Sequence, residues 1–209
     1  MEYSPAQHLP RAHTEPPRDR YLTLDEIKRL WSACKIEASH SGYILRLLLL
    51  TGQRVSEVSK ATWDEFDLEH RVWRIPQERS KNKTSHEIYL ADGTINILRE
   101  LHAQRFSKFL FSNTGVTPFS GFSKAKRRVD EASGITNWRQ HDLRRTFATH
   151  VSQELGVQPI VVDKILNHRS GVARGILGVY QRGEYLKERR DALVCWDTFL
   201  RDLIGCDTY

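Results

Sequence analysis

The chain has 209 residues, of which 39% are hydrophobic and 28% are charged. This composition supplies enough apolar residues for a folded core, so it excludes general disorder. The chain carries 32 lysines and arginines against 26 aspartates and glutamates, and the resulting net charge of +6 favours an anionic partner, with nucleic acid among the candidates.

Neither a membrane nor an oxidising compartment is indicated by the sequence. The longest apolar run, residues 44–50, is interrupted by Arg46 and is far shorter than the roughly 20 residues that a membrane span needs. The first ten residues have neither the basic start nor the apolar stretch of a secretory signal. The three cysteines (Cys34, Cys195 and Cys206) form no CxxC spacing, which argues against a disulfide framework or a zinc knuckle. We therefore expect a protein of the reducing cytoplasm.

The first quarter of the chain predicts a tail followed by three helices. Residues 1–20 contain four of the seven prolines, which is typical of an extended tail or linker. A Thr-x-x-Glu capping box at Thr23 predicts the start of an amphipathic helix. Residues 43–50 are apolar on nearly every side, which predicts a buried helix that ends at Gly52. A short helix is expected to begin near Val55.

The remaining elements predict an α+β domain, mostly α-helical with a small antiparallel β-sheet. Residues 71–75 and 87–90 read as two strands of a hairpin, joined by a long, basic, exposed connection. Further helices are predicted from residue 91 onward, over 120–132, over 141–151 and over 159–166. Residues 183–209 are expected to contain a C-terminal amphipathic helix. Its apolar stripe comprises Leu186, Leu193, Trp196, Leu200 and Leu203.

The usual signatures of nucleotide, dinucleotide and zinc chemistry are missing from the sequence. GxxxxGK[ST], GxGxxG, HExxH and GxSxG do not occur, and no acidic cluster has the spacing of metal ligands. The sequence therefore gives no support for hydrolysis of nucleoside triphosphates, dinucleotide redox chemistry or zinc hydrolysis. What remains is a set of arginines and histidines in apolar surroundings.

Each of these residues, and the Asp142 and Tyr180 near them in the sequence, has two interpretations when it is taken alone. Arg54 follows the buried helix and can point into a cleft, but an ion pair with Glu57 is the simpler explanation. His141 and Arg144 share a helix face on which both can donate to a phosphate oxygen, and a solvated surface explains the same spacing. Asp142, between them, fits a helix N-terminal charge. His168 and Tyr180, taken singly, fit ordinary structural positions.

Taken in order, these residues resemble a known family. The series TGxRxSE, a basic hairpin lysine, HxxRRTFATH, LNHxSG and YxR is similar to the catalytic domain of the tyrosine recombinase (phage integrase) family. The resemblance covers roughly residues 21–200. It implies the fold of that catalytic domain, and a site-specific recombinase, an integrase of a phage or genomic island, that cuts and rejoins DNA.

The resemblance also implies a set of catalytic residues. In this family two arginines and a histidine bind the scissile phosphate, a second histidine assists them, a hairpin lysine acts as an acid and a tyrosine is the nucleophile. The matching positions are Arg54, Lys81, His141, Arg144, His168 and Tyr180. Lys83 is an alternative to Lys81, because hairpin registers slip easily in such an alignment. Glu57 matches an acidic position that we interpret as structural or orienting.

The implied mechanism uses no metal, nucleotide or other cofactor. Arginines remain charged at any working pH, favour the phenolate of the tyrosine and stabilise the charge that builds up on phosphorus. The lysine protonates the departing 5′ oxygen. A 3′-phosphotyrosyl bond conserves the bond energy until a 5′ hydroxyl of a partner strand reverses the step.

Partners and alternatives follow from the same resemblance. The expected partner is a duplex DNA attachment site, with a homotetramer on DNA for the full-length protein, a monomer for the isolated domain and no membrane. Candidate DNA contacts, besides Lys83, are the basic residues Lys124, Lys126, Arg127 and Arg128, although a solvated helix face explains them equally well. A non-catalytic DNA-binding remnant and a type I topoisomerase remain alternatives.

Three features depart from the family pattern or stay open. The spacing of 12 residues from His168 to Tyr180 is long and rich in glycine, and Tyr185 is a second candidate nucleophile. The family's N-terminal core-binding domain is expected to be absent from this chain. The C-terminal stripe packs on its own domain by default, and we hypothesise that it docks on a neighbouring subunit in the assembled complex.

Overall fold

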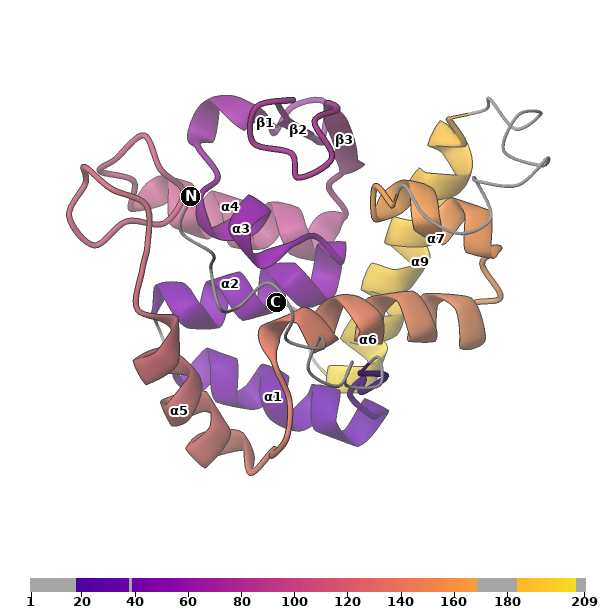
Figure 1. Ribbon diagram of the computed structural model, residues 1–209, viewed down its shortest axis with the longest axis horizontal. Helices are drawn as coiled ribbons and strands as arrows, with labels where there is room; N and C mark the ends of the chain where they lie inside the picture. The colour runs from indigo at the N-terminus through magenta and orange to yellow at the C-terminus, as the bar shows by residue number, and fades with distance from the viewer. Residues whose placement is uncertain (1–17, 38, 169–183, 206–209) are drawn as a thin grey trace, which may run out of the picture.

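The computed structural model describes residues 18–37, 39–168 and 184–205 of the chain (Figure 1). Its helices are α1 (Leu24–Ile36), α2 (His40–Thr51), α3 (Val55–Ser59), the 3₁₀-helix η2 (Trp63–Glu65), α4 (Asp92–Ala103), α5 (Phe122–Ser133), α6 (Gln140–Gln153), α7 (Pro159–Ile165) and α9 (Leu186–Ile204). Its strands are β1 (Phe66–Asp67), β2 (Val72–Ile75) and β3 (His86–Tyr89). The predicted α+β class and the order of its helices are confirmed.

Local sequence signals explain where the first helices begin and end. Thr23 and Glu26 form the predicted capping box at the start of α1, with side-chain to backbone distances of 3.2 and 2.9 Å. Helix α2 ends at Gly52, whose φ of +66° lies in the left-handed region that glycine adopts without a Cβ penalty. The turn after Gly52 leads directly into α3, so Arg54 stands at a fixed helix start.

The sheet is a three-stranded antiparallel meander in the order β1-β2-β3. Trp73 lies opposite Ile88, and Ile75 lies opposite His86. Trp73, Ile75 and Ile88 are buried, while the residues between them face outward, as expected for a sheet with one face on the core. The hairpin prediction is confirmed; β1 was not predicted, because two residues carry no periodicity to detect.

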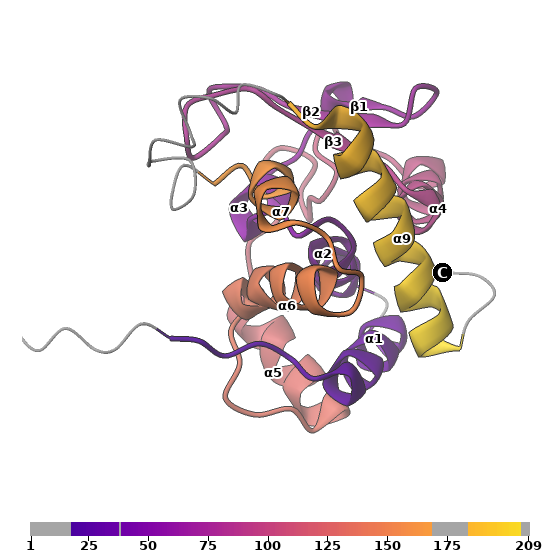
Figure 2. The same ribbon diagram turned by 90° about the vertical axis from the view of Figure 1, so that its right-hand side faces the viewer.

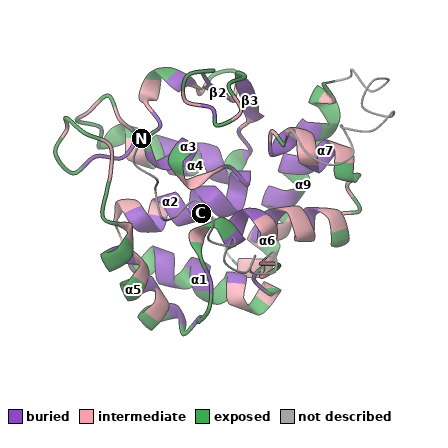
Figure 3. Ribbon diagram, viewed as in Figure 1, coloured by how far each residue is buried: buried purple, intermediate pink, exposed green. Residues whose placement is uncertain are grey.

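Helix α2 forms the centre of the core and packs against α1, α3, α4, α5, α6 and α9. It is buried along nearly its whole length (Figure 3). The buried set includes Arg46, whose guanidinium lies over the Tyr43 ring at 4.5 Å from its centroid. The positive charge inside the apolar run is therefore stabilised by an aromatic face.

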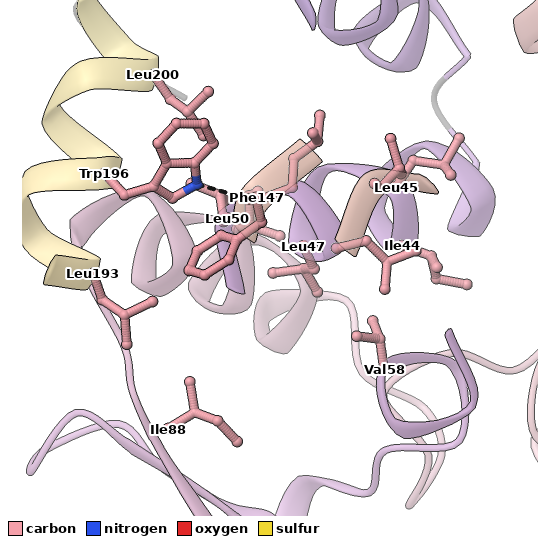
Figure 4. Close-up of a cluster of buried hydrophobic side chains, with 14 of the residues drawn as sticks. Ile44, Leu45, Leu47, Leu50, Val58, Ile88, Phe147, Leu193, Trp196 and Leu200 are labelled. Carbon is pink, nitrogen blue, oxygen red and sulfur yellow. Dashed lines mark hydrogen bonds between the residues drawn. The ribbon is translucent and has the colours of Figure 1, made fainter. Parts of the chain in front are cut away.

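Helix α9 packs on its own domain, between β3 at one end and α1 at the other (Figure 2). Figure 4 shows Trp196, Leu193 and Leu200 directed toward α2 and Phe147. The Trp196 side chain is fully buried, and its indole N–H donates to the carbonyl of Leu49 at 2.8 Å. These residues are covered by their own domain, as in the default interpretation, and docking of the stripe on a neighbouring subunit in the assembled complex stays a hypothesis. Leu186, at 62% exposure, lies outside the buried stripe.

Helix ends and a loop lie on the side of the molecule opposite the C-terminal half of α9. In Figure 2, α3, α6 and α7 lie together on one side, and the connection between β2 and β3 reaches toward the same side. Within the described part of the chain, no helix combines the length and hydrophobicity needed to cross a membrane.

Candidate functional site

The first arginine of the site is fixed by the turn between α2 and α3. The Glu57 carboxylate accepts from the backbone N–H of Arg54 at 3.1 Å and from its guanidinium at 2.9 Å. Glu57 is buried and Arg54 nearly so, with side-chain exposures of 2% and 12%. The expected ion pair is present, and it fixes the direction of the guanidinium. A second guanidinium nitrogen donates to the carbonyl of Asn167 at 3.3 Å.

The second arginine, Arg144, is buried in α6 and held by backbone carbonyls rather than by a carboxylate. Its guanidinium donates to the carbonyls of Gly52, at 2.9 Å, and of Leu166. Burial and the nearby charge of Arg54 lower the pKa of Arg144 to about 9, which still leaves the group charged at neutral pH. Because carbonyls only partly compensate a full positive charge, this site favours the arrival of an anion.

His168 lies beside Arg144 at the end of α7. Its Nδ1 is 3.0 Å from the Asp163 carboxylate, and its Nε2 accepts from Nε of Arg144 at 3.4 Å. Burial and the charge of Arg144 lower the pKa of His168, so the neutral form with the proton on Nδ1 predominates at neutral pH. His168 can then donate from Nε2 only after it takes up a second proton, and a bound anion would favour that uptake.

His141 stands at the exposed first turn of α6, one turn before Arg144. Partial burial of its ring, then the charges of Arg145 and Arg144, lower the pKa of His141, and the charge of Lys81 adds to this effect. Lys81 is exposed on the β2–β3 connection. The neighbours of Lys81, Ser80 and Asn82, both bond Asn167, and these contacts bring the connection beside the site.

A buried carboxylate supports the start of α6. Asp142 is fully buried, and it accepts from the backbone N–H of Arg139 at 2.8 Å, from Arg145 at 2.9 Å and from Arg18 at 3.0 Å. Burial alone would raise the pKa of Asp142, but the hydrogen bonds of Arg18 and Arg139 hold it below its usual value. The residue is therefore more than a helix N-terminal charge, because it also ties the segment before α1 to the site helix.

The hairpin connection is attached to the site through Asn167. Nδ2 of Asn167 donates to Oγ of Ser80 at 3.2 Å, and Nδ2 of Asn82 donates to the Asn167 carbonyl. Ser80 is 2% exposed, whereas Asn82 and Asn167 are half-buried, so the attachment is partly shielded from solvent. Asn167 has a φ of +49°, a left-handed conformation that asparagine tolerates better than most residues.

The remaining predicted residues differ in what the structure says of them. Tyr180 lies outside the described residues. Tyr185, the second candidate nucleophile, is partly buried against the core at the start of α9. Lys83, an exposed residue, has a φ of +56°.

The candidate DNA contacts on α5 fall into two pairs. Lys126 pairs with Asp130 at 2.7 Å and Arg128 pairs with Glu37. Lys124 and Arg127 are exposed.

Sequence reasoning missed the groups that hold the site together. They are Asp163, Asn167, Ser80, Asn82 and the carbonyls of Gly52 and Leu166. Asp163 lies five residues before His168, a spacing that becomes a contact only because the chain leaves α7 in between. Backbone carbonyls carry no side-chain signal at all. Of the described residues, no group of three or more histidines, cysteines, aspartates or glutamates could hold a metal ion.

The fold defines the class of protein. The XerA recombinase structure superposes with a TM-score of 0.62 at 24% identity, over 83% of this chain and 65% of that one. A lambda integrase (75–356) dimer bound to a COC′ core site gives a TM-score of 0.61 at 20% identity, over 77% of this chain and 61% of that one. At these identities the likeness establishes the fold, which is that of a tyrosine recombinase catalytic domain.

The sequence comparisons establish the family. The model of the phage integrase family matches residues 20–173. Prophage integrase IntZ of Escherichia coli (strain K12) is 29% identical over 84% of this chain and 43% of its own length. Tyrosine recombinase XerA of Saccharolobus solfataricus is 30% identical over 73% of this chain and 50% of its own length. The chain belongs to the phage integrase family, and it spans half or less of the length of these two relatives.

Proposed function

We propose that this chain is the catalytic part of a site-specific recombinase that cuts and rejoins duplex DNA through a 3′-phosphotyrosine. The observation that carries the proposal is the meeting of Arg54, Arg144 and His168 around the ends of α2 and α7. His141 lies one turn before Arg144 on α6, and the residues on either side of Lys81 bond Asn167. Two arginines and two imidazoles favour a phosphodiester as ligand, because Arg144 is bonded by two carbonyls and the neutral ring of His168 and has no carboxylate partner among the described residues.

In the proposed reaction each residue has a separate task. Arg54 and Arg144 hold the two non-bridging oxygens of the phosphate, and His168, once protonated, donates to one of them. The Tyr180 oxygen attacks phosphorus while its proton passes to His141. The bond from phosphorus to the 5′ oxygen breaks, and Lys81 gives that oxygen a proton. A 5′ hydroxyl of a partner strand then reverses the step, so that the number of phosphodiester bonds is unchanged.

The proposed partner is an attachment site in duplex DNA, inside a cytoplasm. Relatives by fold are described as a recombinase bound to its difH substrate and as a lambda integrase tetramer bound to a Holliday junction. By analogy we propose that the whole protein works as a tetramer on DNA and that the catalytic domain alone is a monomer. Lys124 and Arg127 are the α5 residues best placed to contact phosphates, because their charges are exposed.

The experiment that tests the proposed function looks for the covalent intermediate. The chain is incubated with a pool of duplexes of random sequence, each carrying a nick that lets the cleaved end escape, and the DNA that stays attached to denatured protein is sequenced. Mass spectrometry then identifies the modified residue. We expect nucleotides on Tyr180, no adduct with Tyr180→Phe, and a normal adduct with Tyr185→Phe, the matched control.

Other outcomes would contradict all or part of this proposal. Binding to DNA without any adduct would favour a non-catalytic remnant. An adduct accompanied by relaxation of supercoiled plasmid, with no joining of strands from two duplexes, would favour a topoisomerase. An adduct on Tyr185 would keep the reaction and move the nucleophile.

A further inference from the structure

Asn167 connects three separate parts of the site. It lies between the last turn of α7 and His168. Its carbonyl accepts from the Arg54 guanidinium at 3.3 Å and from the Asn82 amide, and its side-chain amide donates to Ser80 at 3.2 Å. One residue thus contacts the arginine at the start of α3, the hairpin connection and, through the backbone, the histidine.

The hairpin connection needs such an attachment, because it extends beyond the sheet. Pairing between β2 and β3 ends where Ile75 lies opposite His86. Arg79 fixes the β2 side of the connection by donating to the carboxylate of Glu65 at 2.6 Å and to the carbonyl of Glu57 at 3.1 Å. Farther along, the described contacts to the body of the protein pass through Ser80 and Asn82, and both lead to Asn167.

Lys81 lies between the two attached residues. Its own side chain is exposed, so neighbouring contacts must determine where its ammonium group stands. We propose that Asn167 is a positioning residue for Lys81: its amide holds Ser80 and its carbonyl holds Asn82, which together keep the lysine over the phosphate site. The inference rests on the proposed function, in which Lys81 protonates the leaving oxygen.

The electrostatics agree with this geometry. The charge of Lys81 is one of the causes that lower the pKa of His141, as expected if Ser80 and Asn82 hold the connection at Asn167. A connection released from Asn167 would let Lys81 sample positions away from the phosphate. Since proton transfer needs the donor within hydrogen-bonding distance of the leaving oxygen, the rate of cleavage would fall with the fraction of time spent there.

The first test uses the protein alone. Asn167→Gly keeps the left-handed backbone and the carbonyl, and it removes only the bond to Ser80. Ser80→Ala removes the same bond from the other side. Asn137→Gly is the matched control, because Asn137 also has a positive φ, +51°, and its side chain also makes one tertiary hydrogen bond, which it accepts from Arg18 at 3.2 Å.

Hydrogen exchange measures the attachment directly. The amide of Lys83, which donates to the carbonyl of Ser80 at 3.0 Å, is the reporter. We expect the amides of residues 79–83 to exchange about tenfold faster in Asn167→Gly and in Ser80→Ala, corresponding to the loss of one hydrogen bond, and no more in the double variant than in either single one. Unchanged exchange in Asn167→Gly, or an equal increase in Asn137→Gly, would overturn the inference.

The second test separates positioning of the acid from general damage. A duplex with sulfur in place of the bridging 5′ oxygen has a leaving group that departs without a proton. We expect Asn167→Gly to slow adduct formation on ordinary DNA about tenfold and to match the unmodified chain on the sulfur duplex. Lys81→Ala should show the same pattern more strongly.

The outcomes distinguish this inference from the proposed function. Equal slowing of Asn167→Gly on both duplexes, or no slowing on either, would overturn the positioning role while an active unmodified chain would leave the recombinase proposal standing. If the unmodified chain forms no adduct on either duplex, the proposed function fails and Lys81 has no leaving group to serve.

Discussion

Two regions of the molecule differ in how their polar and charged groups are paired. One is the buried seam between α2, α6 and α9, and the other is the edge that carries Arg54 and Arg144. In the seam, apolar side chains close around Trp196, and the one polar group of that indole has a carbonyl acceptor at 2.8 Å. At the edge, Arg144 is buried yet is held by carbonyls, beside a second arginine that lowers its pKa. The polar group of the seam is satisfied within the protein, whereas at the edge Arg54 is paired with Glu57 and the charge of Arg144 is left for an anionic ligand.

The seam and the edge are connected through Gly52. Gly52 ends α2, contacts the seam through Phe147, and offers its carbonyl to Arg144. The rigid seam therefore holds Arg144 in place through a backbone carbonyl rather than through a carboxylate that would compete with a phosphate. Substitutions in the seam should change stability, and substitutions at the edge should change binding and catalysis.

The largest expected effect is on the stability of the seam. Trp196→Ala should lower the free energy of unfolding by about 3–5 kcal/mol, because it removes a fully buried aromatic ring and leaves a cavity. Urea unfolding followed by circular dichroism measures this change. Leu186→Ala, at a residue that is 62% exposed on the same helix, is the matched control and should cost less than about 0.5 kcal/mol. Equal losses in both variants would remove the distinction between seam and surface.

A comparable effect, on catalysis rather than on folding, is expected at the edge. Arg144→Lys keeps the charge but loses the planar fork that bonds two carbonyls, and with it the proposed grip on the phosphate, so adduct formation should fall about 10²–10³-fold. The rate of covalent complex formation measures it. Arg145→Lys, one residue on, changes a partly exposed ion pair with Asp142 and should cost less than about fivefold. A fully active Arg144→Lys variant would contradict the assigned role.

The third prediction concerns pH and the contact between the sheet and α7. His86 is 8% exposed, its Nε2 lies 2.8 Å from the carbonyl of Ile165, and burial lowers its pKa to about 4. Between pH 6.5 and 4 the unfolded chain therefore binds more protons at this residue, so stability should fall with falling pH by up to about 3 kcal/mol.

Comparison of unfolding free energies across this pH range tests the role of His86. His86→Gln keeps a donor for the carbonyl of Ile165 and should flatten the pH dependence. His70→Gln, at a residue whose side chain is 72% exposed, should leave it unchanged. An unaltered pH slope in His86→Gln would show that other groups carry the acid sensitivity.

The smallest expected effect is at Gly52, the residue that connects the seam with the edge. A Cβ at Gly52 would lie 2.6 Å from Cδ1 of Phe147, and the φ of +66° disfavours any side chain there. Gly52→Ala should therefore cost about 2 kcal/mol of stability. It should also shift the carbonyl that Arg144 uses, so adduct formation should fall at temperatures where the variant is still folded. Gly134→Ala, with a φ of +65° and only the tip of Arg29 within 4 Å, is the control for backbone strain alone.

Periodic and capping signals predicted most of the fold. The apolar run of α2, the capping box of α1 and the alternation in β2 and β3 each depend on residues close in sequence. The burial of α9 on its own domain was given as the default and is present in the structure, whereas its docking on a neighbour in the assembled complex stays a hypothesis, because an amphipathic stripe does not say which surface covers it. β1 was missed because its pairing with β2 is a tertiary contact.

The residues of the site also fall into those that the sequence indicated and those that it did not. Arg54, His141, Arg144 and His168 carry functional groups in recognisable spacing, so the resemblance pointed to them, and their catalytic roles stay predictions. Asn167 was not singled out, because its contacts to Ser80 and Asn82 join positions about 85 residues apart. The choice of Lys81 over Lys83 and of Tyr180 over Tyr185 stays a prediction.

The most direct test of the central claim is a crystal structure of the chain grown with tungstate, an oxyanion that is easily located by its scattering. The account predicts one tungstate between Arg54 and Arg144, with Nε2 of His168 turned from Arg144 to the anion and with His141 and Lys81 beside it. Tungstate bound elsewhere, with Arg144 still bonded to His168 and the edge unoccupied, would contradict the claim that this edge is a phosphate site.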